Sequence, residues 1–594
     1  MPPKNERPIK NRRRKPDATQ RPDPHSFYVP GQPRIKHLTW FVTPNFEARR
    51  LEATTELTFT RWGRYVDLDT RDLEILEVRT HIGQTGRKLR WELGPTDEIR
   101  GKRLRIFLPN GLRRITINYR TSPDATGLQW LTTEQTGGSH PFCYSQGEMV
   151  NTRSFLPCQD TPCVRFTYEA YIYPHRPLTC VMAAIGGPNH WKMERPIPSY
   201  LVAFAIGELE HATIGPRSSV WASPQMVREA QLEFEGIEGA IKQAEKIFGP
   251  YRWGRFSILV MPPAFPYGGM ENPGLTFVSP SIVAGDGSGR NVAWHELMHH
   301  WFGNYVTNAR WSDFWLNEGW TMWGQFRLTE AILGRTAALL DLALYQNDFD
   351  RDRANFERRG QEHLVCLEPN LDGMNPDDSF SMIPYHMGHL FLREVERLAG
   401  RRAMERFARA YIKRFAFQSI TTEQFMRFLK RKLPKVAAQM DLKAWRRVPG
   451  LPAGTRKVVS RRAHEIKRMA EGGTIMPPNW SPREICYYLE CLPEGEVGRG
   501  LCNELETRYG FSAATNLEIR ATFLTVAVKL GFEYVYNRAA GLLAQIGRMK
   551  YLRPMYQALH TNPATRDRAR HEFERLRPTY QHHAASAIER VLAA

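Results

Sequence analysis

The chain has 594 residues, a formal net charge of +20 and 42% hydrophobic residues. This length exceeds what one hydrophobic core supports, so we expect several domains, and the composition excludes a wholly disordered chain. No apolar run approaches the roughly 18 residues needed to cross a bilayer, and the polar, proline-rich N-terminus does not resemble a secretory signal. Eight cysteines are spread without a CxxC pair, as expected of reduced thiols packed in cores. We therefore expect a cytoplasmic protein with no membrane partner.

Part of the basic excess lies near the N-terminus, in residues 10–15 (KNRRRK). Such a run can bind nucleic acid or act as a nuclear address, but it is more often a solvated tail. We predict that residues 1–34 form a disordered basic tail. No nucleic-acid partner is expected, although the tail leaves this open.

Residues 35–217 show the alternation of half-buried strands. Residues 37–42 (HLTWFV), 51–59 (LEATTELTF), 104–108 (LRIFL) and 164–173 (VRFTYEAYIY) are short and rich in aromatic or β-branched side chains. Proline, glycine and aspartate separate them at turn spacing. The pattern predicts an all-β domain.

The pattern changes in residues 218–448. Residues 226–248 have helical periodicity and end at a Gly-Pro pair, a common helix stop. Extended segments follow at 256–261 and 275–278, and then a pair of helices. Strands followed by a helix pair predict an α+β domain; with the candidate metal ligands His295, His299 and Glu318 on that helix pair, described below, it has the pattern of a thermolysin-like catalytic domain.

A Pro/Gly cluster at residues 449–455 (PGLPAGT) predicts a linker over 449–460. Residues 461–594 then read almost entirely as amphipathic helices with short loops. They predict an α-helical, solenoid-like domain, although no repeat period is firm. The clearest predicted helices are 501–509, 517–530, 534–546, 566–576 and 582–592.

The segment WHELMHHWF contains an HExxH motif formed by His295, Glu296 and His299. Residues four apart on a helix share a face, so both imidazoles can bind one metal ion. Glu318, with eighteen residues between it and His299, is the best candidate for a third ligand. Two histidines, one carboxylate and an open fourth position are typical of catalytic zinc. HExxH alone also occurs by chance in amphipathic helices. The spacing of Glu318 favours a zinc site over a chance match, and we expect one Zn²⁺ per chain. Gln325, two turns further, is a candidate to orient a ligand.

Upstream, residues 267–273 read YGGMENP. Gly268 and Gly269 would let another backbone approach, and Met270 with its neighbours could offer an extended edge to a peptide. Glu271 would then lie near the amino end of that peptide, where a carboxylate can pair with an α-ammonium group. The alternative is an ordinary glycine turn.

YGGMENP, HELMH and WLNEGW together resemble the gluzincin zinc aminopeptidases. The wording PPAFPYGGMENPGLTF, VTNARWSDFWLNEG and SFLPCQDTP resembles the branch containing leukotriene-A(4) hydrolase and aminopeptidase B. The resemblance runs from about residue 35 to the C-terminus. It implies a saddle-like β domain, a thermolysin-like domain and a C-terminal helical domain, the order already predicted.

The resemblance makes His295, His299 and Glu318 the zinc ligands, Glu296 the general base and Glu271 the group that recognises the amine. In residues 145–150 (SQGEMV) it implies that Gln146 and Glu148 contact the first residue of the substrate. Tyr385, in the segment IPYHMG, takes the place of a tyrosine that stabilises the oxyanion. From the sequence alone, a core tyrosine would be the simpler interpretation.

Arg548 and Lys550, in GRMKY, resemble a pair that holds the carboxyl end of short peptides. Residues two apart can converge on one carboxylate only from a turn or a helix start, and a surface-charge role is the alternative. Asp377 matches an aspartate used in the epoxide reaction of the branch; it is also a candidate to favour basic side chains. Phe380 stands where the epoxide pattern has a tyrosine, and Glu148 where it has a glutamine.

We therefore predict a zinc aminopeptidase that acts on peptides with a free N-terminus, works as a monomer and has weak or no epoxide hydrolase activity. One alternative is a bifunctional epoxide hydrolase and aminopeptidase. Another is a basic nucleic-acid-binding or scaffold protein with a vestigial peptidase domain, suggested by the pI of about 9.6.

Overall fold

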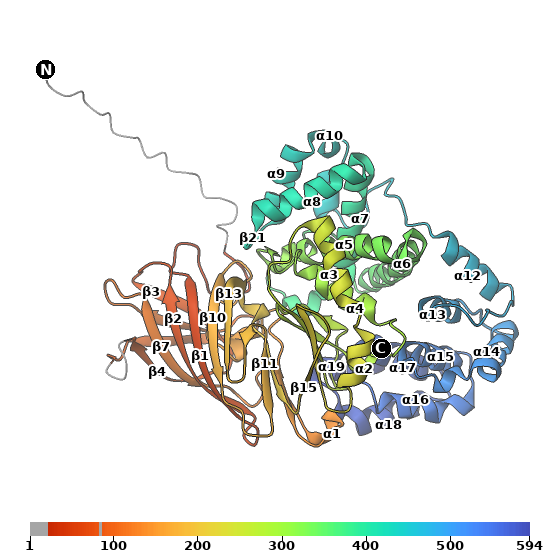
Figure 1. Cartoon of the computed structure of the whole chain (residues 1–594), viewed down its shortest axis with the longest axis horizontal. Coiled ribbons are helices and arrows are strands. Elements are labelled where there is room, and N and C mark those ends of the chain that lie inside the picture. The colour runs from red at the N-terminus through yellow and green to blue at the C-terminus, as the bar shows by residue number, and fades with distance from the viewer. Residues whose placement is uncertain (1–21, 82–85, 594) are drawn as a thin grey trace.

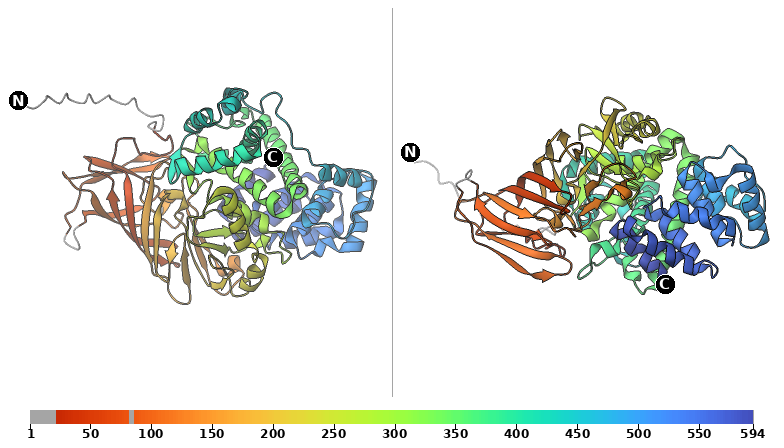
Figure 2. Two further views of the ribbon diagram at one scale, coloured as in Figure 1. Left: turned by 45° about the horizontal axis from the view of Figure 1, so that its top comes forward. Right: turned by 90° about the horizontal axis from the view of Figure 1, so that it is seen from below.

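A computed structural model of the chain describes residues 22–81 and 86–593. In Figure 1 a β region at one end, a mixed region in the middle and a helical region at the other end follow one another in chain order. The two further views in Figure 2 keep the same order. The β region also touches the helical region directly, because Gln135 Nε2 donates to the Pro578 backbone oxygen at 2.9 Å. The basic run at residues 10–15 lies outside the described residues.

The largest sheet of the β region has the order β12-β13-β10-β1-β2-β7-β4. Burial alternates along β1, where Leu38, Trp40 and Val42 point into the core, as expected of a sheet with one covered face. Strand β1 runs parallel to β10 and antiparallel to β2. The strands are β1 (Ile35–Asn45), β2 (Arg50–Phe59), β4 (Glu74–Thr80), β7 (Arg114–Arg120), β10 (Arg165–Ile172), β12 (Ile185–Gly186) and β13 (His190–Pro198).

Two smaller sheets complete this region. One has the order β3-β6-β5 and the other β11-β14-β9-β8. Strand β9 matters for the site, because the chain passes directly from its last residue, Ser145, into Gln146. The strands are β3 (Tyr65–Thr70), β5 (Trp91–Asp97), β6 (Gly101–Phe107), β8 (Leu128–Leu131), β9 (Phe142–Ser145), β11 (Thr179–Met182) and β14 (Phe204–Gly207); a short helix, α1 (Thr133–Thr136), follows β8.

The sheet of the mixed region has the order β15-β16-β17-β19-β18. Its strands are β15 (Glu210–Thr213), β16 (Ser218–Ala222), β17 (Phe256–Val260), β18 (Gly269–Met270) and β19 (Leu275–Val278). The predicted domain boundary at 217/218 cuts the β15–β16 hairpin. That boundary is wrong, because β15 pairs with the catalytic sheet; the boundary lies between β14 and β15.

The helix predicted over residues 226–248 is two helices, α2 (Val227–Glu233) and α3 (Ile237–Phe248), with Gly236 between them. Glycine weakens a helix interior, and here the chain turns at it. The predicted metal ligands lie on α4 (Arg290–His299) and α5 (Trp315–Leu333), which we call the metal-site helices. The remaining elements of this region are α6 (Arg335–Arg358), α7 (Ile383–Ala399), α8 (Arg401–Phe415), α9 (Thr422–Lys432), α10 (Pro434–Ala437), α11 (Leu442–Arg447), β20 (Val306–Asn308) and β21 (Gln418–Ile420).

Helix α5 is buried along most of its length, and its buried residues include polar ones such as Glu318, Thr321 and Gln325. The Trp320 ring stacks on Phe302, with centroids 5.0 Å apart, and on Tyr411 at 4.9 Å. A Cβ on Gly319 would lie 2.6 Å from the Gly388 Cα. This glycine pair lets α5 and α7 cross closely, so residues near the start of α7 reach the metal-site helices.

No regular element lies between α11 and α12, the segment predicted as a linker. Beyond it the predicted helical domain is confirmed, with α13, α15, α17 and α19 packing in succession. Within the described residues no helix is long and apolar enough to cross a membrane. The helices are α12 (Arg461–Glu471), α13 (Pro482–Glu490), α14 (Glu496–Tyr509), α15 (Leu517–Lys529), α16 (Tyr536–Leu543), α17 (Met549–Thr561), α18 (Arg566–Leu576) and α19 (His582–Leu592).

The prediction of a disordered tail is wrong for residues 22–34. Asp23, His25 and Ser26 are buried, and Ser26 Oγ donates to Asp69 Oδ2 at 2.6 Å. Gln32 donates to Asp67 at 2.7 Å. The segment lies across the β3-β6-β5 sheet, and the sequence could not show this because the partners are distant along the chain.

Candidate active site

The predicted metal ligands meet at one point. His295 and His299 lie one turn apart on α4, and Glu318 lies in the first turn of α5. The two Nε2 atoms are 3.2 Å apart, and each is 3.4 Å from Glu318 Oε2. Their convergence gives one of the candidate metal-binding groups among the described residues.

These three residues fit a zinc ion. Ligands at about 2.0–2.1 Å in a tetrahedron are separated by about 3.3–3.4 Å, which matches the three measured separations. Glu318 Oε2 is also buried without a geometrically sound hydrogen bond, as expected of an atom whose partner is a metal. Burial acts to raise the pKa of Glu318, but His299 and His295 outweigh it and lower that pKa to about 2.

The outer ring nitrogens of both histidines are also held. His295 Nδ1 lies 3.0 Å from Gln325 Oε1, the contact predicted for Gln325, and His299 Nδ1 lies 3.2 Å from Thr321 Oγ1. Such contacts fix the tautomer and orientation of a ligand. Thr321 was missed in the sequence; its position one helical turn after Glu318 was the signal available.

Glu296 points to the same centre from α4 and is 5% exposed. A Cβ on Gly269 would lie 2.4 Å from Glu296 Oε1, so only glycine at 269 leaves the carboxylate its place. Burial raises the pKa of Glu296 to about 7, although the two histidines act to lower it. The glycines of YGGMENP therefore do more than form a turn.

Glu271 follows the short strand β18 and is 3% exposed. Its Oε1 has no hydrogen-bond partner among the described residues and lies 3.9 Å from His299 Nδ1. Burial raises the Glu271 pKa. Asn304, a residue the sequence analysis missed, donates to the Glu271 backbone oxygen at 2.7 Å and fixes this segment.

Gln146 and Glu148 reach the cluster from the β region, as the resemblance implies. Gln146 Nε2 lies 3.2 Å from Met270 Sδ, and Glu148 Oε1 is buried without a partner among the described residues. Burial, together with the charges of Glu271 and Glu318, raises the Glu148 pKa well above its usual value.

Asp377 lies beside Glu148 on a short 3-10 turn, η7 (Pro376–Ser379). Its Oδ1 accepts from Met149 N and its Oδ2 from Asn151 Nδ2, both at 3.1 Å. The Asp377 carboxylate is therefore bound to the segment that carries Glu148. Nearby, the Tyr267 and His583 rings lie 6.4 Å apart. His583, on α19, was not predicted.

Tyr385 lies in the first turn of α7, with its ring 6.0 Å from that of His295. Burial and neighbouring carboxylates, first among them Glu318, raise the Tyr385 pKa well above 10, so the phenol keeps its proton. The Phe380 ring lies 6.3 Å away, edge to face. The predicted oxyanion partner is therefore beside the metal ligands, with no second phenol at position 380.

Arg548 and Lys550, predicted together to bind the carboxyl end of a peptide, lie in different surroundings. Arg548 is the N-cap of α17, is 8% exposed, and its Nη1 donates to Ser281 Oγ and Tyr551 OH at 3.1 and 3.3 Å. A Cβ on Gly268 would lie 2.7 Å from Arg548 Nη2, so Arg548 contacts the glycine loop. Lys550 is half-exposed and pairs with Glu518.

Three family models match the chain. They are the peptidase M1 N-terminal domain over residues 33–184, the peptidase family M1 domain over 232–445 and the leukotriene A4 hydrolase C-terminal domain over 480–592. Leukotriene A-4 hydrolase from Xenopus laevis is 33% identical over 93% of this chain and 96% of its own length. This chain belongs to the M1 peptidase family.

Other M1 peptidases agree with this assignment. Aminopeptidase B from Rattus norvegicus is 36% identical over 75% of the chain and 73% of its own length. The structure of yeast leukotriene A4 hydrolase with bestatin matches with a TM-score of 0.91 and 29% identity, covering 98% of this chain and 99% of that one. The predicted family and three-domain architecture are thus confirmed, and the chain is a metallo-aminopeptidase of a zinc-dependent family.

Proposed function

We propose that His295, His299 and Glu318 hold one zinc ion per chain and that the chain removes the N-terminal residue of short peptides. The donor separations and the orphaned Glu318 oxygen support these three ligands. When bound, zinc supplies Lewis-acid polarisation of a carbonyl and lowers the pKa of water. All the proposed residues come from a single chain, so a monomer suffices.

Glu296 is the proposed general base. From its place against Gly269 it takes a proton from the water whose oxygen bonds to the carbonyl carbon, and it passes that proton to the amine nitrogen as the C–N bond breaks. Glu296 itself ends the reaction in its starting protonation state. Tyr385 donates its phenolic proton as a hydrogen bond toward the carbonyl oxygen, where negative charge grows. This donor acts more strongly on the transition state than on the substrate.

The buried, unpaired Glu271 oxygen carries the assignment to aminopeptidases. Glu271 and Glu148 each present an oxygen without a partner among the described residues, close to the metal ligands. A substrate α-ammonium group supplies what these carboxylates lack, because buried charges are stable when paired. An ammonium held there leaves room for one residue before the cut.

The test is turnover of alanyl, leucyl and arginyl arylamides by the purified chain, with metal content measured on the same sample. We expect activity that a chelator abolishes and added zinc restores. Glu296→Gln should keep the zinc and lose about 10³-fold or more in kcat, since it removes the proton acceptor. An active Glu296→Gln enzyme would exclude Glu296 as the base.

Epoxide hydrolysis is proposed to be weak or absent. Phe380 provides no hydroxyl beside Tyr385, and Glu148 replaces a neutral amide. Incubation with the leukotriene epoxide should yield little dihydroxy acid compared with peptide turnover. Comparable rates of the two reactions would establish the bifunctional alternative.

A further inference from the structure

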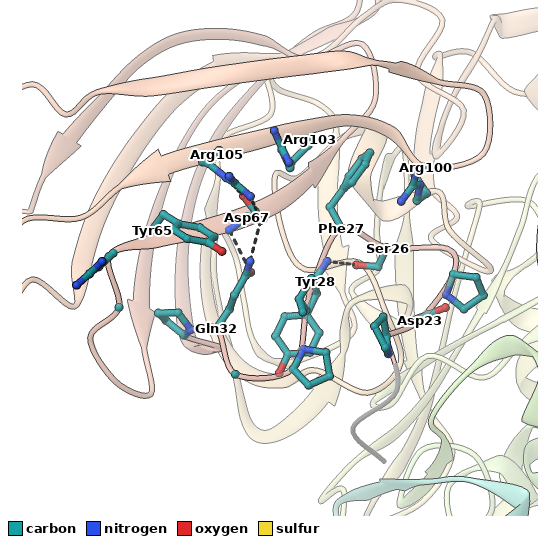
Figure 3. Close-up of a pocket in the computed structure, with 18 residues that line it drawn as sticks. Asp23, Ser26, Phe27, Tyr28, Gln32, Tyr65, Asp67, Arg100, Arg103 and Arg105 are labelled. Carbon is teal, nitrogen blue, oxygen red and sulfur yellow. Dashed lines mark hydrogen bonds and ion pairs between the residues drawn. The ribbon is translucent and has the colours of Figure 1, made fainter. Parts of the chain in front are cut away.

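Residues 22–33 form what we call the N-terminal strap, which lies across the β3-β6-β5 sheet (Figure 3). Ser26 Oγ and the Phe27 backbone N–H donate to Asp69, each at 2.6 Å, and Gln32 donates to Asp67. Arg105 makes two further bonds to Asp67, at 2.7 and 2.8 Å. The strap is thus anchored to the β region by buried, charge-assisted hydrogen bonds, which are strong.

His25 connects the strap to a different region. Its Nε2 lies 3.2 Å from the Leu371 backbone oxygen and 3.1 Å from that of Met374. Its Nδ1 lies 3.3 Å from Asp23 Oδ1, and Asp23 also accepts from Thr161. His25 is 1% exposed. This buried imidazole therefore links the β region to a loop of the catalytic region more than 340 residues away.

That loop, residues 371–382, which we call the site loop, carries Asp377. Apart from the short turn η7 it has no regular structure, so its position depends on side-chain bonds and on the packing of Leu371 and Met374 against the core. Three sets of bonds hold it: His25 to its first part, Asp377 to Met149 and Asn151, and Asp352 to the Met382 N–H at 2.7 Å. The bond from His25 reaches Met374, three residues before Asp377, and His25 has no role in the proposed chemistry.

We propose that His25 is a positioning residue for the substrate site: by holding the Leu371 and Met374 carbonyls it keeps Asp377 against the segment that carries Gln146 and Glu148. A hydrogen bond joins His25 to Met374, the backbone of the site loop leads from Met374 to Asp377, and two further hydrogen bonds join Asp377 to Met149 and Asn151. The N-terminal strap thereby sets the fraction of molecules in which Gln146 and Glu148 are positioned to bind the first residue of the peptide. This inference rests on the proposed function only in taking Gln146 and Glu148 as the binding site for the first residue of the peptide.

The test compares His25→Phe, which keeps a ring but loses the donor, with Gln32→Leu. Gln32 is a matched control, because it lies in the same strap, is also buried, and its side chain bonds within the described residues to Asp67 of the β region and not to the site loop. His25→Phe should raise KM for arylamides about tenfold with kcat nearly unchanged, since apparent affinity falls with the competent fraction. Gln32→Leu should leave KM unchanged. His25→Gln, whose amide N–H can replace the Nε2 donor, should restore KM.

Hydrogen exchange measures the positioning without relying on turnover. Amides of residues 371–380 should exchange faster in His25→Phe and at the parent rate in Gln32→Leu and His25→Gln. Equal exchange in His25→Phe and the parent, or equal KM changes in His25→Phe and Gln32→Leu, would overturn the proposal. An inactive parent would refute the proposed function, and the exchange comparison would still decide the role of His25.

A double-mutant cycle locates the path. If His25 acts through Asp377, adding His25→Phe to Asp377→Ala should change KM by less than about twofold, because coupled residues are not additive. Fully additive effects would show that His25 acts by another route and would overturn the proposal. Melting temperatures of all variants confirm that folded proteins are compared.

Discussion

The two ends of the proposed substrate path differ in how their charges are compensated. At the amine end, Glu271 and Glu148 each have a buried oxygen without a partner among the described residues. At the carboxyl end, Lys550 pairs with Glu518, which also lies 3.6 Å from Arg483. A buried carboxyl oxygen without a partner destabilises the free protein, so the two oxygens at the amine end point to a ligand that supplies the partner.

Like the carboxylates at the amine end, Arg548 lacks a hydrogen-bond partner of opposite charge among the described residues. Its Nη1 bonds only to neutral hydroxyls, its Nε is buried without a partner among the described residues, and it touches Gly268. Lys550, in contrast, forms an ion pair with Glu518. Arg548 and Lys550 resemble a functional pair in the sequence, but the structure compensates only Lys550 with a carboxylate. We therefore propose that Arg548 binds ligand and that Lys550 has a structural role.

The largest effect is expected at the amine end, in Glu271→Gln. Removing one partner of a buried charge pair costs about 2–5 kcal/mol, so kcat/KM for alanyl arylamide should fall about 30-fold or more. Zinc content should be unchanged, because Glu271 is not a proposed ligand. A fall below about threefold, with zinc retained, would remove Glu271 from amine recognition.

The parent enzyme provides a second check on the same end. N-acetylated peptides lack the ammonium group, so the parent should discriminate strongly against them, and Glu271→Gln should lose most of that discrimination. Discrimination that persists in the variant would assign it to Glu148 or to steric exclusion.

A smaller effect is expected for Arg548→Ala. A charge-assisted hydrogen bond is worth about 1.5–3 kcal/mol, so kcat/KM for tripeptides should fall about tenfold or more. Arylamides have no carboxylate and should be hydrolysed at the parent rate, which makes them the internal control. Equal losses on both substrates would show that Arg548 only supports the glycine loop.

Local spacing made part of this site predictable. The HExxH helix and Glu318 lie within 24 residues, and helix geometry alone brings the two histidines together. Tyr385, Glu148 and Arg548 came only from the family resemblance, because nothing in their neighbouring sequence distinguishes them from core or surface residues. The main helices and strands were predictable for the same local reason.

Long-range partners were not predictable. The polar, proline-rich residues 22–34 have the composition of a tail, yet His25 is buried against carbonyls of Leu371 and Met374. Nothing near Lys550 in sequence indicates that Glu518, 32 residues away, compensates it. Burial and pairing of this kind depend on the folded arrangement, which single-sequence patterns do not specify.

The smallest effect is expected for Lys550→Ala. Lys550 and Glu518 are both partly exposed, and such pairs contribute about 0–1 kcal/mol. Loss of this pair should therefore lower the melting temperature only slightly. Because Glu518 already occupies the Lys550 ammonium, tripeptide kcat/KM should change by less than about threefold. Glu518→Gln is the converse test: freeing the Lys550 ammonium should strengthen binding of the tripeptide carboxylate. If Lys550→Ala instead matched Arg548→Ala in its loss on tripeptides, with arylamides unaffected, the two residues would act together and the division at the carboxyl end would be wrong.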